Sequence, residues 1–265
     1  MIRREELAVD GRAAHVWSGG QGSPLLLLHG AWGGAEMHWA PVWDTLATKC
    51  RVIAPDFPGL AYESSWVPAS FDEAAGWVDG VLDASASSAA WIVGNSFGAA
   101  IASRVASLSP ERCLGLVLVD GAPAPSLPAF ARSLMRRWPL RQLMEGILRR
   151  SAYGPSTLPR AFADPRRAPQ EIRDLLAQRC PRQVVLTTAI VLGDNAPVTP
   201  PQGPTLVLWG AQDRLRGSTV KTARRLQSSL PEAQVVVIPD AGHLPQVEQP
   251  DRFCHALLNF VQGSE

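Results

Sequence analysis

The stretch that decides the fold is Ile92-Val93-Gly94-Asn95-Ser96-Phe97-Gly98, which contains the pentapeptide G-x-S-x-G. Glycines two residues either side of a serine let a strand and the helix after it approach closely at a sharp turn. The serine takes strained backbone geometry there, and its hydroxyl lies clear of the sheet at the positive end of the helix. The flanks agree, because Trp91–Val93 suits a buried strand and residues 99–106 suit a helix packed on a sheet. Ser96 is therefore a candidate nucleophile.

Length and composition exclude several classes of protein. The 265 residues suit one α/β domain, alone or with an insertion, and the hydrophobic fraction of 46% favours a folded core over disorder. The formal net charge of +1 gives no overall attraction to nucleic acid, so we expect no nucleic-acid partner. The longest apolar runs have the length of strands, so we expect no stable insertion into a membrane. Oligomeric state is left open.

Two further features of the sequence bear on the cellular compartment of the protein. The amino terminus, Met1–Glu6, lacks the apolar stretch of a secretory signal. The four cysteines are widely spaced and contain no C-x-x-C pair, which is typical of small core residues rather than of a disulfide or zinc framework. We therefore expect a cytoplasmic protein that holds no metal; a mature secreted form with its signal removed is the alternative. The cysteines are Cys50, Cys113, Cys180 and Cys254.

Short apolar runs alternate with helical patterns along most of the chain, which is typical of an α/β fold with a mostly parallel sheet covered on both faces. We expect strands at residues 7–9, 14–17, 25–28, 51–54, 91–93, 114–119, 205–209 and 234–238. We expect helices at residues 38–47, 71–84, 99–106, 218–229 and 250–261, with Ser70 as the cap of the second.

The alternation stops between residues 122 and 204. This segment is rich in arginine and proline, with helical patterns at residues 129–148 and 170–177. The interpretation is an α/β core made of residues 1–121 and 205–265, with residues 122–204 inserted as a helical cap over one end of the sheet.

A serine nucleophile needs a base, and the base needs an acid that orients it. His243 follows the strand at 234–238, and Asp213 follows the strand at 205–209, so both belong to the carboxyl edge of the sheet, where ligands bind in open α/β folds. Asp120 follows the strand at 114–119 and is the rival acid. Asp240, Asp56 and His29 are interpreted as turn or loop-positioning residues. His15, His38 and His255 lack such a context and are expected to be peripheral.

His29-Gly30-Ala31 follows the strand at 25–28, at the same edge. In such a turn the backbone N–H of Ala31 can point at the substrate. With the N–H of Phe97, the residue after the nucleophile, it would form an oxyanion hole. Trp32 comes next and is a candidate for the wall of the acyl pocket.

These motifs together resemble the α/β-hydrolase superfamily over nearly the whole chain. The matching elements are His29-Gly30, Pro55-Asp56-Phe57-Pro58-Gly59, the Gly94–Gly98 elbow, Gly210-Ala211-Gln212-Asp213 and Gly242-His243, in the expected order. The resemblance implies an α/β-hydrolase fold with a helical cap and no cofactor. It also implies the triad order Ser96, Asp213, His243. The function that we expect is a serine hydrolase that cleaves a carboxylic ester or thioester through an acyl-enzyme.

Asn95 before the nucleophile also resembles the elbow of the carbon–carbon bond hydrolases of aromatic ring cleavage. Those enzymes commonly carry Trp after the catalytic histidine, where this chain has Leu244. Asn95 and Leu244 are therefore candidate substrate-binding residues. The alternatives are a carbon–carbon hydrolase of a diketone-type substrate, a biosynthetic lyase, acyltransferase or cyclase, and a small-molecule-binding protein, because the fold alone does not fix function.

The insertion is strongly basic. Between Pro125 and Val185 there are twelve arginines and four acids, an excess of 12 − 4 = +8 in a chain of net charge +1. On a helix at 129–148, Phe130, Leu134, Trp138, Met144 and Ile147 would fall near one stripe. The plain interpretation is a cap helix with a solvated basic face. The alternative is that the cap recruits something anionic, such as a carboxylate substrate, a coenzyme A or carrier-protein thioester, or a membrane surface.

Overall fold

The computed structural model describes residues 1–124, 127–178, 181–215 and 217–264, and within them eight strands form one sheet in the order β1-β2-β4-β3-β5-β6-β7-β8. The first two strands pair antiparallel as a hairpin, β2 pairs antiparallel with β4, and all other neighbours are parallel. The mostly parallel sheet is thereby confirmed. The strands are β1 (Arg3–Val9), β2 (Arg12–Gly19), β3 (Pro24–Leu28), β4 (Arg51–Pro55), β5 (Ala90–Asn95), β6 (Cys113–Val119), β7 (Thr205–Gly210) and β8 (Gln234–Ile238).

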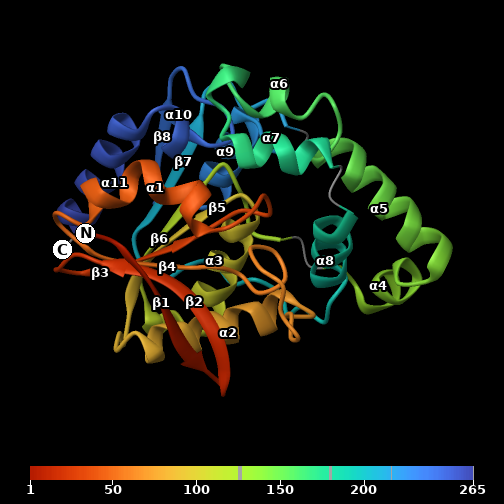
Figure 1. Ribbon diagram of the computed structural model, residues 1–265, viewed down its shortest axis with the longest axis horizontal. Coiled ribbons are helices and arrows are strands. Elements are labelled where there is room, and N and C mark those ends of the chain that lie inside the picture. Colours follow the sequence, from red (N-terminus) through yellow and green to blue (C-terminus); the bar gives the residue numbers. More distant parts are fainter. Residues whose placement is uncertain (125–126, 179–180, 216, 265) are drawn as a thin grey trace.

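Helices cover both faces of this sheet (Figure 1). α1 (Ala35–Leu46) and α11 (Pro250–Ser264) pack on one face, while α2 (Phe71–Ala84) and α3 (Phe97–Leu108) pack together on the other. The strands between them read as continuous apolar runs because both of their faces are buried; every residue of β5 and β7 is buried. α9 (Val220–Ser229) packs on β7, and the short α10 (Pro245–Glu248) precedes α11.

Local signals explain most element boundaries. The Ser70 hydroxyl accepts a hydrogen bond from the Glu73 N–H at 3.0 Å, as expected of the cap of α2. α1 begins three residues before the expected start because Oδ1 of Asp56 accepts the Ala35 N–H at 2.7 Å. That capping group comes from a loop distant in sequence, so the residues next to the helix carry no sign of it.

Between β6 and β7 the described chain forms helices only: α4 (Ala129–Met135), α5 (Trp138–Ala152), α6 (Leu158–Ala161), α7 (Gln170–Ala177) and α8 (Pro181–Val191). The expectation of a single helix at 129–148 is wrong. Pro139 has no N–H to donate to the carbonyl of Met135, and its ring would clash with that carbonyl. The chain therefore breaks after α4 and restarts with Pro139 in the first turn of α5.

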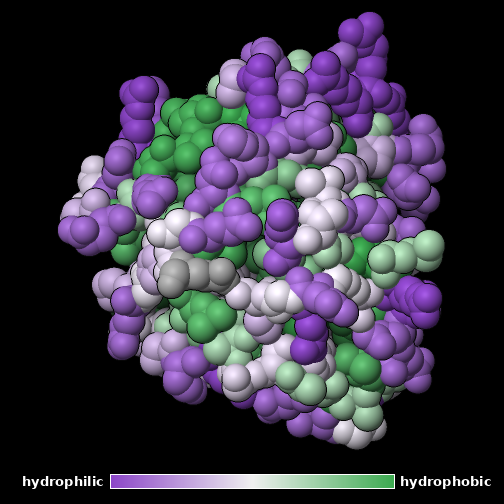
Figure 2. All heavy atoms as spheres, turned by 90° about the vertical axis from the view of Figure 1, so that its left-hand side faces the viewer, coloured by the Kyte–Doolittle hydropathy of each residue, from purple (hydrophilic) through white to green (hydrophobic). Residues whose placement is uncertain are grey.

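The described residues include no helix long and apolar enough to cross a bilayer. The face that carries both ends of the chain presents mainly hydrophilic side chains, with hydrophobic ones grouped between them (Figure 2). Cys50 and Cys254 are buried and Cys113 is half-buried, whereas Cys180 lies outside the described residues, as does Arg179 of the basic segment.

Candidate active site

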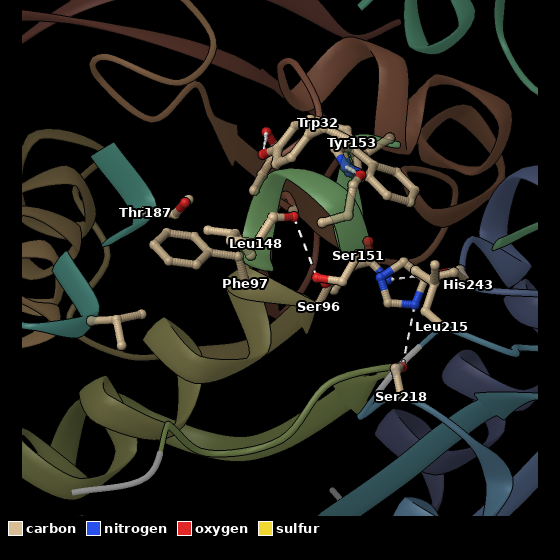
Figure 3. A pocket seen from close by; sticks show the side chains of 16 residues that line it. Trp32, Ser96, Phe97, Leu148, Ser151, Tyr153, Thr187, Leu215, Ser218 and His243 are labelled. Carbon is tan, nitrogen blue, oxygen red and sulfur yellow. Dashed lines mark hydrogen bonds between the residues drawn. The ribbon is translucent and has the colours of Figure 1, made fainter. Parts of the chain in front are cut away.

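A cavity of about 260 Å³ lies where the carboxyl ends of the central strands meet α5 and α8 (Figure 3). Its lining comes from three sources: loops at the strand ends, the start of α3, and the two helices above them. The loops and α3 contribute Gly30, Ala31, Trp32, Asn95, Ser96, Phe97, Leu215, Ser218 and His243, and α1 contributes His38. The segment between β6 and β7 contributes Leu148, Ser151, Ala152, Tyr153, Thr187 and Val191.

Ser96 sits at the turn between β5 and α3 with φ 54° and ψ −111°. A positive φ on a residue other than glycine costs of order 1–3 kcal/mol and is found mostly where function requires it. A Cβ on Gly94 would overlap the carbonyl of Gly98, and a Cβ on Gly98 would overlap that of Leu28. Both glycines of the pentapeptide are therefore required for the close approach of strand and helix, as the sequence predicts.

Nδ1 of His243 lies 2.7 Å from Oδ2 of Asp213, and both side chains are buried. The same carboxylate oxygen accepts the Ser218 hydroxyl at 2.6 Å, while Oδ1 accepts the Leu215 N–H at 2.9 Å. These bonds hold Asp213 in one orientation toward the imidazole. The structure thus places the predicted base and acid in contact, with the base lining the cavity that Ser96 also lines.

Asp120, the rival acid, is also fully buried beside this pair. Both of its carboxylate oxygens accept the Gly210 N–H, at 3.0 and 3.1 Å. Burial and the neighbouring Asp213 raise the pKa of Asp120 well above 3.8. The direct contact with His243 belongs to Asp213, whereas Asp120 holds the end of β7.

Asp120, Asp213 and His243 are also the one group of described residues with the spacing of metal ligands, their nearest atoms lying within 4.8 Å of one another. Hydrogen bonds from His243, Ser218, Leu215 and Gly210 already engage the carboxylates. The geometry is that of a hydrogen-bonded cluster.

Ala31 and Phe97, the predicted oxyanion donors, both line the cavity beside Ser96. Phe97 is the first residue of α3, so its N–H has no partner within the helix. The turn that carries Ala31 is held by His29, whose Nδ1 contacts the Gly30 carbonyl at 2.6 Å and whose Nε2 accepts the Phe57 N–H at 2.8 Å. Burial lowers the pKa of His29, so the ring is neutral and positions the loop, as the sequence predicts.

Trp32 forms part of the cavity wall, and its ring packs edge-on against His243 with centroids 5.5 Å apart. Its Nε1 donates to the carbonyl of Ala152 at 3.2 Å, and the Tyr153 hydroxyl donates to that of Ala31 at 3.4 Å. The end of α5 is therefore tied to the turn that carries Ala31. Leu244, in contrast, does not line the cavity: it is fully buried in the cluster behind Trp32. Its expected contact with substrate is replaced by a packing role.

Asn95 lines the cavity and is fully buried. Its Nδ2 donates to the backbone carbonyls of His243 at 3.1 Å and Val119 at 3.2 Å. The residue expected to bind substrate therefore also holds the histidine loop against the nucleophile strand.

The expectation that His38 is peripheral is wrong, because it is buried and lines the cavity. Its Nδ1 lies 3.0 Å from the carbonyl of Gly34, and burial with the nearby His29 lowers its pKa to about 3. Side chains in the first turn of a helix point back toward the preceding loop, which is the signal in the sequence that places His38 here. For Ser218, Ser151 and Thr187 the sequence offers no comparable signal.

Comparison with known proteins agrees with the fold. The chain matches the alpha/beta hydrolase family over residues 25–256. It is 29% identical to a 2-hydroxymuconate semialdehyde hydrolase of Pseudomonas sp. (strain CF600), covering 98% of this chain and 94% of the relative. It is 28% identical to a pimeloyl-[acyl-carrier protein] methyl ester esterase of Aliivibrio salmonicida, covering 93% and 95%.

Among solved structures, a thermophilic esterase from Thermogutta terrifontis superposes with a TM-score of 0.76 at 26% identity, covering 99% of both chains. The chain also spans 65% of the length of a longer relative, at 30% identity: the dihydrolipoyllysine-residue acetyltransferase component of an acetoin cleaving system from Pseudomonas putida. The relatives thus differ in the bond on which they act.

Proposed function

The chain belongs to the alpha/beta hydrolase family, and from this premise we propose that it is a serine hydrolase that cleaves a carboxylic ester or thioester through Ser96, His243 and Asp213. The observation that carries the proposal is the 2.7 Å contact between His243 and Asp213 beside the cavity that Ser96 lines. The similarity to two esterases supports ester hydrolysis as the class of reaction here.

In the proposed mechanism the Ser96 hydroxyl attacks the substrate carbonyl while His243 takes its proton. Asp213 holds the imidazole in the tautomer that presents a free nitrogen to Ser96 and stabilises the imidazolium that forms. The N–H groups of Ala31 and Phe97 stabilise the oxyanion; one such donor typically supplies about 3 kcal/mol. His243 then protonates the leaving group, and water activated by the same histidine resolves the acyl-enzyme.

The cavity sets the expected substrate size. Its volume of about 260 Å³ is at the small end for ligand pockets. Much of the wall is apolar, formed by Trp32, Phe97, Leu148, Val191 and Leu215. We therefore expect short acyl groups to be accepted better than long ones. Residues 122–204 act as the cap in this proposal, because their helices supply the cavity residues that distinguish one substrate from another. We retain the cytoplasm as the proposed location.

Asn95 favours a second candidate function, hydrolysis of a carbon–carbon bond in a diketone-type substrate. It gives this chain the elbow that resembles the carbon–carbon hydrolases, and a 2-hydroxymuconate semialdehyde hydrolase covers nearly all of the chain. In this chain, however, Nδ2 of Asn95 is engaged by two backbone carbonyls, and Leu244 is buried in the cluster that also contains Trp32. The ester is therefore the first choice.

The test is hydrolysis of p-nitrophenyl esters of graded acyl length by the wild type and by Ser96→Ala. Turnover that favours short chains and vanishes in the variant supports the proposal. If the folded wild type hydrolyses no ester of any length but cleaves 2-hydroxymuconate semialdehyde in a Ser96-dependent manner, the second function replaces the first.

A further inference from the structure

The pair of helices α4 and α5 stands apart from the rest of the molecule in how little it buries. We call residues 129–152 the arm; the structure describes all of them, and neither helix contains a buried residue. By comparison α7, with eight residues, buries Ile172 and Leu176. Since helices in proteins owe most of their stability to a packed apolar face, the arm lacks the contact that usually supplies it.

The arm is nevertheless rich in large apolar side chains. Among the described residues eleven large hydrophobic side chains are exposed, and six of them lie within the arm. The two most exposed are aromatic: Phe130 at 77% and Trp138 at 73%. The others are Leu134, Leu140, Leu143 and Ile147. A concentration of this kind marks an interaction surface rather than the scattered exposure of an ordinary surface.

Arginines accompany these apolar residues. The arm carries six arginines and one acid, an excess of 6 − 1 = +5. Arg132 and Arg136 pair with Asp194, and Arg141 pairs with Glu145. The exposed Arg137, Arg149 and Arg150 form no ion pair with any residue that the structure describes. Arg150 lies three residues after Ile147, so the two share a flank of α5.

Charge decides which partner fits. A second copy of the chain docked on this surface by twofold symmetry would bring two surfaces of the same positive charge together, which is unfavourable. An anionic surface instead pairs with the arginines. α4 and α5 lie at one outer edge of the molecule in Figure 1, and their exposed apolar side chains are distributed over both helices. A fluid lipid layer can contact such residues without shape complementarity.

We propose that the arm docks on an anionic lipid surface. Phe130, Leu134, Trp138, Leu143 and Ile147 enter the apolar layer while Arg137, Arg149 and Arg150 contact the lipid phosphates. Aromatic and aliphatic residues on one side with arginines beside them are the composition of helices that lie in a membrane interface. At 15 residues, α5 is about 22 Å long, too short to span a bilayer, so the arm lies on the membrane.

The docked arm would bring the membrane close to the cavity. Leu148, Ser151 and Ala152, which belong to the same helix α5, line that cavity. The helix that would contact the lipid therefore also forms part of the wall of the cavity that Ser96 lines. The face with both ends of the chain, shown in Figure 2, would point away from the lipid.

The test is co-sedimentation of the full chain carrying Ser96→Ala, so that lipid hydrolysis plays no part and the result does not depend on the proposed function. Vesicles of phosphatidylcholine alone are compared with vesicles of phosphatidylcholine and phosphatidylglycerol in equal parts. We expect binding to the anionic vesicles at least tenfold tighter than to the neutral ones, and weaker as salt is raised, because exposed charges are screened.

Two variants separate the contribution of the arginines to vesicle binding from that of the apolar side chains. Arg137→Gln with Arg149→Gln and Arg150→Gln should weaken binding about a hundredfold, at about fivefold for each arginine near the surface. Trp138→Ser with Leu143→Ser and Ile147→Ser should weaken binding at least tenfold. Circular dichroism verifies that the fold is retained.

The matched controls change the same residue types elsewhere. Arg224→Gln with Arg225→Gln on α9, and Leu108→Ser with Val237→Ser, should bind like the parent, since all four side chains are exposed outside the arm. Soluble glycerol phosphate should weaken vesicle binding no more than sodium chloride does at the same ionic strength. Absence of binding, equal loss in the controls, full competition by glycerol phosphate, or dimers in solution that the arm variants dissociate would each overturn the proposal.

Discussion

Nδ1 of His243 lies 2.7 Å from Oδ2 of Asp213, although thirty residues separate them in the chain. The contact follows from the sheet: β7 and β8 pair in parallel with Gly210 opposite Ile238, so the loops that leave their carboxyl ends start side by side. Asp120 directly follows the neighbouring strand β6 and lies within the same cluster. Two buried carboxyl groups therefore adjoin one imidazole, and their roles can be separated.

Asp213→Asn should lower kcat/KM about 10⁴-fold, the loss typical when the orienting acid of such a triad becomes an amide and the histidine takes the wrong tautomer. Asp120→Asn should stay within a few fold of the wild type, because burial and Asp213 raise the pKa of Asp120, which favours the neutral carboxyl that an amide resembles. Ester hydrolysis by both purified variants, with circular dichroism as the check on folding, measures this. A larger loss in Asp120→Asn than in Asp213→Asn would assign the acid to Asp120.

Asp120 should also make stability depend on pH. Its pKa in the folded chain lies above the ordinary 3.8, raised first by burial and then by Asp213. A group of this kind contributes stability that is fully present below the unfolded pKa and is lost as pH rises through the folded pKa. Asn does not titrate, so Asp120→Asn should gain stability relative to the wild type as pH rises from 3.8 toward the raised pKa of the folded chain. The gain is about 1.4 kcal/mol for each unit between the two pKa values.

Urea unfolding of the two proteins at several pH values in that range measures the difference in free energy of unfolding. A difference that stays constant with pH would show that Asp120 titrates normally in the folded chain.

Asn95→Ala should destabilise the fold by about 1–3 kcal/mol, because the buried carbonyl of His243 loses the amide donor 3.1 Å away. It should also lower kcat more than it raises KM, since the loop that carries the proposed base is no longer held against β5. Urea unfolding and steady-state kinetics on a short-chain ester give both quantities. Ser103→Ala serves as the control: it removes a buried hydroxyl bonded within α3, away from the cavity. Unchanged kcat in Asn95→Ala would leave Asn95 with a packing role alone.

Local signals in the sequence predict much of the fold. The Ser70 cap and the Gly94–Gly98 elbow each act within a few residues, and the corresponding elements lie where the pattern indicates. The break between α4 and α5 also has a local cause, because Pro139 prevents one continuous helix. The early start of α1 does not, because its capping group is Asp56, from the loop after β4.

The residues of the site also fall into those that local sequence predicts and those that depend on packing between distant segments. Ser96, Asp213 and His243 follow strands, so the parallel sheet brings them to one edge whatever the rest of the chain does. Tyr153 and Thr187 reach the cavity from helices whose placement depends on their packing, which no periodicity encodes. Leu244 is the opposite case. It follows the proposed base His243 in the sequence, yet its side chain is buried in the cluster that also contains Trp32.

The most direct test of the account is covalent labelling of the wild type with a fluorophosphonate, read by intact mass and by tandem mass spectrometry. The account predicts one adduct per chain on the peptide that contains Ser96, and none on a folded Ser96→Ala variant. An adduct that persists unchanged in Ser96→Ala, or a folded wild type that takes up no label, would contradict the assignment of Ser96 as an activated nucleophile.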